Sequence, residues 1–151
     1  MRSRSRLWYT ALVIPVTVFV VDRITKALFF NQPEIIQSVI PGVLWFQLHL
    51  NTAMAFSLPL WPWVYYPAIF AAFIGLLVAC VKALQQTKLV EFICTLTIVV
   101  AAISNLLDRV YYGGVIDFIA LPTGGIFNLA DVAIVGSVLI WAVTLWKYDR
   151  K

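Results

Sequence analysis

Four long apolar runs dominate the pattern of hydrophobic and polar positions along the chain. They extend from Leu7 to Val21, from Trp63 to Val81, from Phe92 to Leu107 and from Val132 to Trp146. A helix of about 15 residues is only about 22 Å long, and the hydrocarbon core of a bilayer is roughly 30 Å thick. Only the second run is long enough alone, so the other helices must continue through polar residues. We expect membrane spans at about 7–30, 63–81, 92–109 and 131–147.

One stretch between the first two runs has a different period. Residues Phe46–Asn51 alternate apolar and polar side chains, which predicts a half-exposed β strand. Pro41 and Gly42 precede it, and prolines 59 and 62 follow it. We therefore expect a small β element at about 39–60.

Composition agrees with a membrane protein. Of the residues 62% are apolar and only 12% are charged, whereas a soluble domain has about 25% charged residues. This excludes a soluble globule, and the apolar content also excludes a disordered chain. The net charge of +4 is spread over the ends of the apolar runs instead of forming one face, so no nucleic-acid partner is expected.

The positions of lysine and arginine predict the orientation in the membrane. Eight of the eleven basic residues fall on one side of a four-span topology: Arg2, Arg4, Arg6, Lys82, Lys88, Lys147, Arg150 and Lys151. Because basic loops stay in the cytoplasm, both termini are predicted to be cytoplasmic. The first run lacks a small-x-small cleavage site and is read as a retained span, not a signal peptide. The expected fold is an all-α membrane protein with four transmembrane helices and a small extracytoplasmic β element, forming one integral membrane domain over residues 1–151.

Cysteine and histidine offer little chemistry. Cys80 and Cys94 lie in apolar runs without a Cys-x-x-Cys pair, which indicates neither a redox motif nor a zinc site. His49 is the only histidine, so a histidine-based metal site or a Ser-His-Asp triad would depend on it alone. We expect no metal and no cofactor.

Acidic residues instead gather at one membrane boundary. With alternating spans, Asp22, Asp108, Asp117 and Asp131 all come to the outer side, delivered by three helices and one connection. Helical spacing adds partners to the same faces, since residues three or four apart are neighbours on a helix. Lys26 follows Asp22 by four residues, Asp108 and Arg109 follow Asn105 by three and four, and Asp131 follows Asn128 by three. Ionisable groups at membrane depth normally face protein or water.

Structural roles for these residues stay open. Asp22 with Lys26, and Asp108 with Arg109, could be simple ion pairs at helix ends. Asn105 and Asn128 could join helices by hydrogen bonds, and Asp131 could act as an N-terminal helix residue.

Asp117 is different because its neighbours are apolar and no basic residue is near it in sequence. Two carboxylates in a partly dry site share a proton, and such a pair can serve as general acid and base. Asp117 and Asp131 therefore indicate the chemistry of an aspartic hydrolase.

Five segments in order carry a resemblance to a known family. They are Asp22-Arg-Ile-Thr-Lys26, Asn51-Thr-Ala-Met-Ala-Phe56, Asn105-Leu-Leu-Asp-Arg109, Val115-Ile-Asp-Phe-Ile119 and Phe127-Asn-Leu-Ala-Asp131. The chain resembles the bacterial lipoprotein signal peptidases (signal peptidase II), which are intramembrane aspartic proteases, over nearly its whole length.

The resemblance implies the following expectations. The catalytic pair is Asp117 and Asp131, and a second set shapes or supports the site: Asp22, Lys26, Asn51, Asn105, Asp108, Arg109 and Asn128. The substrates are diacylglyceryl-modified prolipoproteins in the bacterial inner membrane, cut just before the lipidated cysteine at the outer leaflet. Membrane lipid surrounds the enzyme, globomycin-like cyclic peptides inhibit it, and the protein is expected to be a monomer without a cofactor.

The chain also departs from that family. Ala53, Ala101, Ala102 and Ser104 stand where glycine is usual or frequent, Arg23 stands where glutamine is usual, and the stretch between 117 and 128 is short. These changes concern pocket shape and substrate preference. Two other classes stay open from sequence: a proton-coupled transporter and a non-catalytic relative that binds acylated peptide. The sequence also leaves open which aspartate is the resting base and whether region 40–60 closes over substrate.

Overall fold

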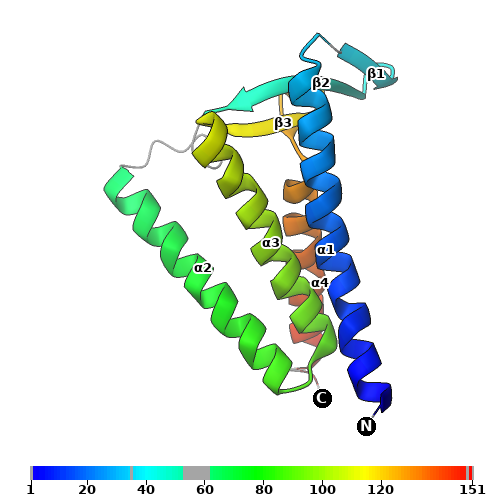
Figure 1. Cartoon of the computed structure of the whole chain (residues 1–151), viewed down its shortest axis with the longest axis vertical. Helices are drawn as coiled ribbons and strands as arrows, with labels where there is room; N and C mark the ends of the chain where they lie inside the picture. Colours follow the sequence, from blue (N-terminus) through cyan, green and yellow to red (C-terminus); the bar gives the residue numbers. More distant parts are fainter. Residues whose placement is uncertain (1, 35, 53–61, 149, 151) are drawn as a thin grey trace.

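The computed structural model describes residues 2–34, 36–52, 62–148 and 150, which form four helices and four strands. The helices are α1 (Arg2–Asn31), α2 (Pro62–Gln85), α3 (Leu89–Tyr112) and α4 (Leu129–Tyr148). The strands are β1 (Ile36–Ile40), β2 (Leu44–Asn51), β3 (Val115–Ala120) and β4 (Ile126–Phe127). The sheet lies across one end of the helices, and both termini lie at the other end (Figure 1).

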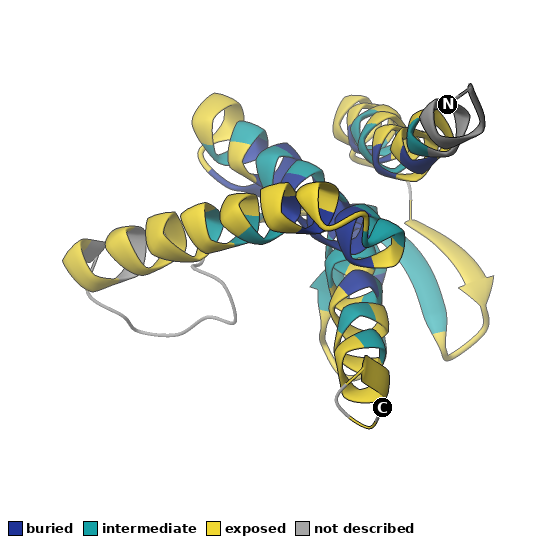
Figure 2. Cartoon of the chain, turned by 90° about the horizontal axis from the view of Figure 1, so that it is seen from below, coloured by how far each residue is buried: buried dark blue, intermediate teal, exposed yellow. Residues whose placement is uncertain are grey.

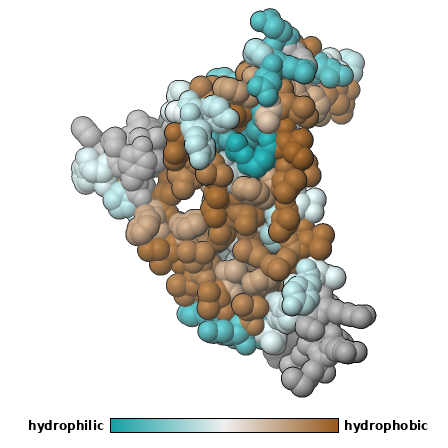
Figure 3. All heavy atoms as spheres, in the orientation of Figure 1, coloured by the Kyte–Doolittle hydropathy of each residue, from teal (hydrophilic) through white to brown (hydrophobic). Residues whose placement is uncertain are grey.

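The helices extend past the apolar runs, as expected. They contain 30, 24, 24 and 20 residues. Among the described residues, three stretches are long and apolar enough to cross a membrane: Pro67–Gln85, Leu89–Tyr112 and Leu129–Tyr148. The first helix is not among them, and it contains Asp22, Arg23 and Lys26. Large apolar side chains are exposed along the helices, and the space-filling view is mostly hydrophobic (Figure 3).

Helix α3 is the centre of the bundle and packs against α1, α2 and α4. Its buried side chains run along its length, from Phe92 through Ile98 and Ala101 to Asp108. Figure 2 shows buried residues gathered where the helices meet, whereas the outer length of α2 is exposed. At the end nearer the termini, the ring of Trp8 meets that of Phe92 edge-on at 5.3 Å.

The sheet is larger than the sequence predicted. Its four strands pair antiparallel in the order β1-β2-β3-β4. The strand expected at Phe46–Asn51 is confirmed as the last six residues of β2, but strands β3 and β4, between α3 and α4, were not predicted from the sequence. Strand β3 is buried at almost every position, so its sequence shows no alternation, and a short continuous apolar run does not distinguish a strand from a helix. The second part of the expected β element, which includes Ala53, lies outside the described residues.

Aromatic side chains join α1 to the sheet. The ring of Phe29 stacks on that of Phe118 in β3 with centroids 4.5 Å apart, and it also meets Phe46 in β2 at 5.3 Å. Such pairs add about 0.5–1.5 kcal/mol beyond the buried area. One helix end is thereby fixed to two strands, which holds the sheet over the end of the bundle.

Two glycines make the turn from α3 into β3. Gly113 ends the helix with φ +73° and donates its N–H to Arg109 O at 3.2 Å, a conformation that glycine adopts without cost. Gly114 lies against the end of β2, where an added Cβ would be 3.0 Å from the backbone oxygen of Asn51. The absence of a side chain at 114 therefore lets β2 approach β3.

The close approach at Gly114 can be tested. In Gly114→Ala the new methyl group would push against the backbone of Asn51, so β2 must shift. Crowding of this kind costs typically about 1–3 kcal/mol, and we expect a lower thermal midpoint in detergent together with weaker activity. Gly75→Ala is the matched control, because nothing lies within 4 Å of its added Cβ. An unchanged midpoint in Gly114→Ala would contradict the tight approach.

Candidate active site

Buried polar side chains are concentrated at the end of the bundle below the sheet. Each of these residues is at most 9% exposed, and they make up most of the buried polar residues that the structure describes. The group comes from α1, α3, β3 and the start of α4, and it consists of Asp22, Lys26, Ser104, Asn105, Asp108, Asp117 and Asn128. In Figure 3 a hydrophilic patch interrupts the hydrophobic surface just below the sheet.

Asp117 sits in the middle of β3 and is 1% exposed. Its two oxygens accept hydrogen bonds from two side-chain amides, from Asn51 Nδ2 at 3.0 Å and from Asn128 Nδ2 at 2.6 Å. The pKa of Asp117 is raised from 3.8 to about 6, chiefly by burial and also by the charge of Asp131, while the two amides and the charge of Lys26 act in the opposite direction. A carboxyl group with this pKa can take up and release a proton near neutral pH.

Asp131 lies in the first turn of α4 and is half-buried. Its backbone N–H donates to Asn128 Oδ1 at 3.0 Å, and its Oδ2 accepts from the backbone N–H of Asn128 at 3.3 Å. This reciprocal pair is a capping box, with Asn128 as the N-cap. The other oxygen of Asp131 accepts from Asn105 Nδ2 at 2.8 Å. The helix-cap role left open for Asp131 is therefore present, and it coexists with a position beside Asp117.

Asn128 connects the two carboxylates. Its amide nitrogen donates to Asp117, while its backbone N–H and its side-chain oxygen bond to Asp131. One residue thus holds an acid on a strand next to an acid on a helix. Two carboxylates fixed in this way, one nearly fully buried and one half-buried, are suited to hold one proton between them and to act as acid and base.

A buried ion cluster lies behind the carboxylate pair. Lys26 Nζ contacts Asp22 Oδ2 at 2.9 Å and Asp108 Oδ2 at 2.8 Å, and all three side chains are 0% exposed. Asp22 Oδ1 accepts from the backbone N–H of Ala130 at 2.9 Å. The predicted pairing of Asp22 with Lys26 is therefore confirmed, and the cluster joins α1, α3 and the N-terminus of α4.

The predicted ion pair between Asp108 and Arg109 is wrong. Asp108 pairs with Arg23 and Lys26 of α1, whereas Arg109 Nη1 donates at 3.5 Å to the backbone oxygen of Asn105 in its own helix. Adjacent residues on a helix point about 100° apart, so Asp108 faces α1 while Arg109 stands at the edge of the site. Helical spacing identifies neighbours three and four residues apart, but it does not show which of them faces the partner helix.

Arg23 and Ser104 were noted in the sequence only as departures from the family and were not predicted as members of the site. Arg23 donates to Ser104 O at 3.2 Å and contacts the carboxylate of Asp108. Ser104 Oγ donates to Asp22 Oδ2 at 2.6 Å. Ser104 lies four residues before Asp108 and next to Asn105, so helical spacing contained the signal for its face. No local signal identified Arg23 as the partner of a residue 85 positions away.

The structure brings together the other predicted residues. Asn51, Asp117, Asn128, Asp131 and Asn105 form one continuous hydrogen-bonded chain, and Lys26 Nζ joins it to the ion cluster by donating to Asn105 Oδ1 at 2.7 Å. Within the part of the chain that the structure describes, no group of three or more histidine, cysteine or acidic side chains could hold a metal ion.

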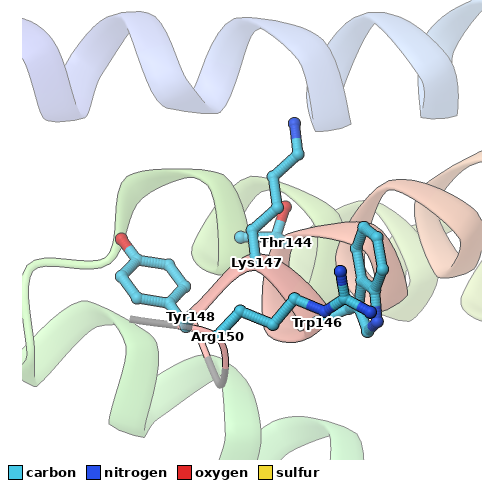
Figure 4. A pocket seen from close by; sticks show the side chains of 5 residues that line it. All are labelled: Thr144, Trp146, Lys147, Tyr148 and Arg150. Atoms are coloured by element: carbon cyan, nitrogen blue, oxygen red, sulfur yellow. The ribbon is translucent and has the colours of Figure 1, made fainter.

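A separate cavity lies at the opposite end of the protein, beside the last turn of α4 (Figure 4). Its lining residues are Thr144, Trp146, Lys147, Tyr148 and Arg150. Arg150 is placed over the ring of Trp146, 4.1 Å from its centroid. The described residues that line this cavity carry no carboxylate, and the cavity lies at the far end of α4 from Asp131.

Apolar helices with a pair of adjacent carboxylates at one end, one buried and one half-buried, are typical of membrane-embedded aspartic hydrolases. Comparison with known proteins makes the assignment specific. The family model of signal peptidase (SPase) II matches residues 14–147. The chain belongs to the signal peptidase II family, and the resemblance seen in the sequence is thereby confirmed.

Individual relatives agree over almost the full length. The lipoprotein signal peptidase of Syntrophomonas wolfei is 33% identical, with 97% of each chain covered. That of Ectopseudomonas mendocina is 31% identical and covers 92% of this chain and 89% of its own. A bacterial membrane enzyme solved by the in meso method at 2.3 Å resolution superposes with a TM-score of 0.75 at 26% identity, over 91% of this chain and 88% of that one.

The raised pKa of Asp117 predicts how stability depends on pH. The group titrates near 3.8 when unfolded and near 6 when folded, so the folded protein holds a proton that the unfolded chain has lost. This stabilisation is complete below pH 3.8 and disappears as the pH rises through 6. We expect the thermal midpoint in detergent to fall between pH 4 and pH 7, and to fall less in Asp117→Asn. Equal slopes in the two proteins would contradict the assigned pKa.

Proposed function

We propose that the chain is the aspartic endopeptidase that removes the signal peptide from diacylglyceryl-modified prolipoproteins, cutting just before the lipidated cysteine. The observation that carries this proposal is the placement of Asp117 and Asp131 on the two sides of Asn128. Membership of the signal peptidase II family supplies the substrate class. A proton relay would need acids along a path through the membrane, whereas the buried acids of the site lie together at one end of the bundle.

The reaction needs only water and the two acids. One carboxylate removes a proton from water, and the oxygen of that water attacks the scissile carbonyl carbon. The protonated partner donates its proton first to the carbonyl oxygen. When the tetrahedral intermediate collapses, the first carboxyl group passes the proton that it took from water to the amide nitrogen, the peptide C–N bond breaks, and the second carboxylate recovers its proton from a hydroxyl of the intermediate. The products are a signal peptide with a new carboxylate and a lipoprotein with a free amine on its lipidated cysteine.

The surrounding amides orient the pair. Asn51 holds Asp117, Asn105 holds Asp131, and Asn128 holds both. Because interacting carboxyl groups titrate as a pair, the proton belongs to the dyad and not to one named residue in the resting enzyme. Asp22, Lys26 and Asp108 join α1 to α3 and to the start of α4, which carry the amides of Asn105 and Asn128, and Arg109 borders the site.

The proposed enzyme acts as one integral membrane domain of the bacterial inner membrane, with four spans and both termini in the cytoplasm. This orientation is supported by the basic residues at the end of the helices opposite the sheet, such as Lys82, Lys88 and Lys147. The dyad then lies at the outer leaflet, where a substrate held by two acyl chains presents its scissile bond. A monomer suffices for this arrangement, and a globomycin-like cyclic peptide would compete for the same site.

Replacing either acid tests the proposed function. General acid–base groups contribute typically about 10²–10⁴-fold, so Asp117→Asn and Asp131→Asn should each lower the rate of cleavage by at least about 10²-fold. The assay is release of the signal peptide from a purified diacylglyceryl-modified prolipoprotein, with folding checked by the thermal midpoint.

Glu91→Gln provides the matched control for this assay. Glu91 is also a buried acid of α3 at 8% exposure, but its partner is Lys88 at the far end of the helix. Its replacement should leave cleavage within about twofold, since it touches no group of the dyad. Substantial turnover by a folded Asp117→Asn protein would disprove the mechanism.

The proposed orientation predicts which side chains are accessible from outside the cell. In a protein whose buried Cys80 and Cys94 are replaced by alanine, single cysteines are introduced as Glu34→Cys at the sheet end and Lys147→Cys at the end of α4. A membrane-impermeant maleimide added to spheroplasts should label position 34 and leave position 147 unlabelled until the membrane is opened. The reverse pattern would place the dyad on the cytoplasmic side.

A further inference from the structure

The side-chain ammonium of Lys26 uses all of its hydrogen-bonding capacity inside the protein. The residue is 0% exposed, and Nζ contacts Asp22 Oδ2 at 2.9 Å, Asp108 Oδ2 at 2.8 Å and Asn105 Oδ1 at 2.7 Å. An ammonium group has three donors and no acceptor. Its third partner must therefore present an acceptor, which determines how the amide of Asn105 is turned.

The orientation of one amide then determines the next. With its oxygen toward Lys26, Asn105 presents its NH₂ group to Asp131 Oδ1 at 2.8 Å. The same oxygen accepts from Asn128 Nδ2 at 3.2 Å, so the NH₂ group of Asn128 faces both Asn105 and Asp117. The oxygen of Asn128 is left to accept the backbone N–H of Asp131 at 3.0 Å.

The opposite orientation is inconsistent with this network. If the amide of Asn105 were reversed, its oxygen would face the carboxylate of Asp131 and its NH₂ group would face the ammonium and the NH₂ group of Asn128. If Asn128 reversed as well, its NH₂ group would meet the backbone N–H of Asp131, and the α4 cap would be lost. Reversed amides are tolerated only if the carboxyl groups that they face are protonated, because a carboxylate is an acceptor only.

We propose that Lys26 is a positioning residue that sets the direction of the amide hydrogen bonds to both Asp117 and Asp131, and thereby the pH range in which the dyad is active. Lys26 has no hydrogen bond to either carboxylate. Besides the direct effect of its charge on Asp117, it acts through Asn105 and Asn128, and the NH₂ group of Asn128 lowers the pKa of Asp117. This inference rests on the proposed function of the dyad.

Other charged groups near the site must be separated from this effect. They are Asp22 and Arg23 from α1, Asp108 and Arg109 from α3, and His49 from β2, which is the cross-strand neighbour of Asp117. Arg23 provides a charge-only reference, because it contacts Asp108 without contacting either amide. His49 is exposed and lies across the strands from Asp117, so His49→Gln identifies any contribution from the imidazole.

The test is the pH dependence of prolipoprotein cleavage in a double-mutant cycle. Lys26→Met should move the acidic limb of the kcat/KM profile upward by roughly one pH unit, the size expected when a hydrogen bond to a charged group is lost. Asn105→Ala should move it by a similar amount, and the double variant should move it no further, because both changes interrupt one chain of bonds. Arg23→Gln and His49→Gln should leave the limb in place.

Two results would overturn the proposal. One is a shift in Arg23→Gln as large as that in Lys26→Met, which would mean that charge alone sets the pH range. The other is additive shifts in the double variant, which would mean that Lys26 does not act through Asn105.

Lys26→Met alone could leave two buried carboxylates unpaired and prevent folding. A second variant therefore combines Lys26→Met with Asp22→Asn, which keeps the net charge of the cluster unchanged. It should show the same shift as Lys26→Met, and an unshifted limb in a folded protein would also contradict the proposal. If Asp117→Asn itself cleaves substrate, the proposed function has failed. If Asp117→Asn is inactive but the Lys26 variants keep the normal limb, only the present inference has failed.

Discussion

The buried contact of one ammonium with two carboxylates is the interaction on which the rest of the protein depends. Lys26, Asp22 and Asp108 are removed from solvent completely, and removing one partner of such a group costs about 3–5 kcal/mol because a charge is left unpaired. Asp22 also binds the backbone N–H of Ala130. Three helices therefore meet at one electrostatic contact, and the helix that carries Asp131 is held at its first turn.

The sheet places Asp117, which lies outside the helix bundle, next to the buried acids of the helices. Asp117 is on a strand, and the strand can enter the site because Phe29 of α1 stacks on Phe118 and because Gly114 allows β2 to come close. The close approach of β2 also lets the Asn51 amide at its end donate to Asp117. The site therefore forms where β3 crosses the end of the helix bundle at which α1, α3 and α4 are joined by the ion cluster.

Much of this could be predicted from the sequence, and the failures have physical reasons. Apolar runs gave the four helices, and the shortness of three of them showed that Asp22, Asp108 and Asp131 continue the helices. Strand β3 was missed because burial on both faces removes the alternation that marks a half-exposed strand. The pairing of Arg23 with Asp108 was missed because it is formed between helices far apart in sequence, and only the packing of α1 on α3 selects it over Arg109.

Asn128 has two roles, because it is the N-cap of α4 and also the hydrogen-bonded bridge between Asp117 and Asp131. Helix ends are the places where folded proteins open first, often long before the whole structure unfolds. In this protein such fraying would not leave the site intact, because one unwound turn releases Asp131 and the amide on Asp117 together. The fraction of molecules able to react is therefore set by a local equilibrium at one helix end, and heat should remove activity before it removes the fold.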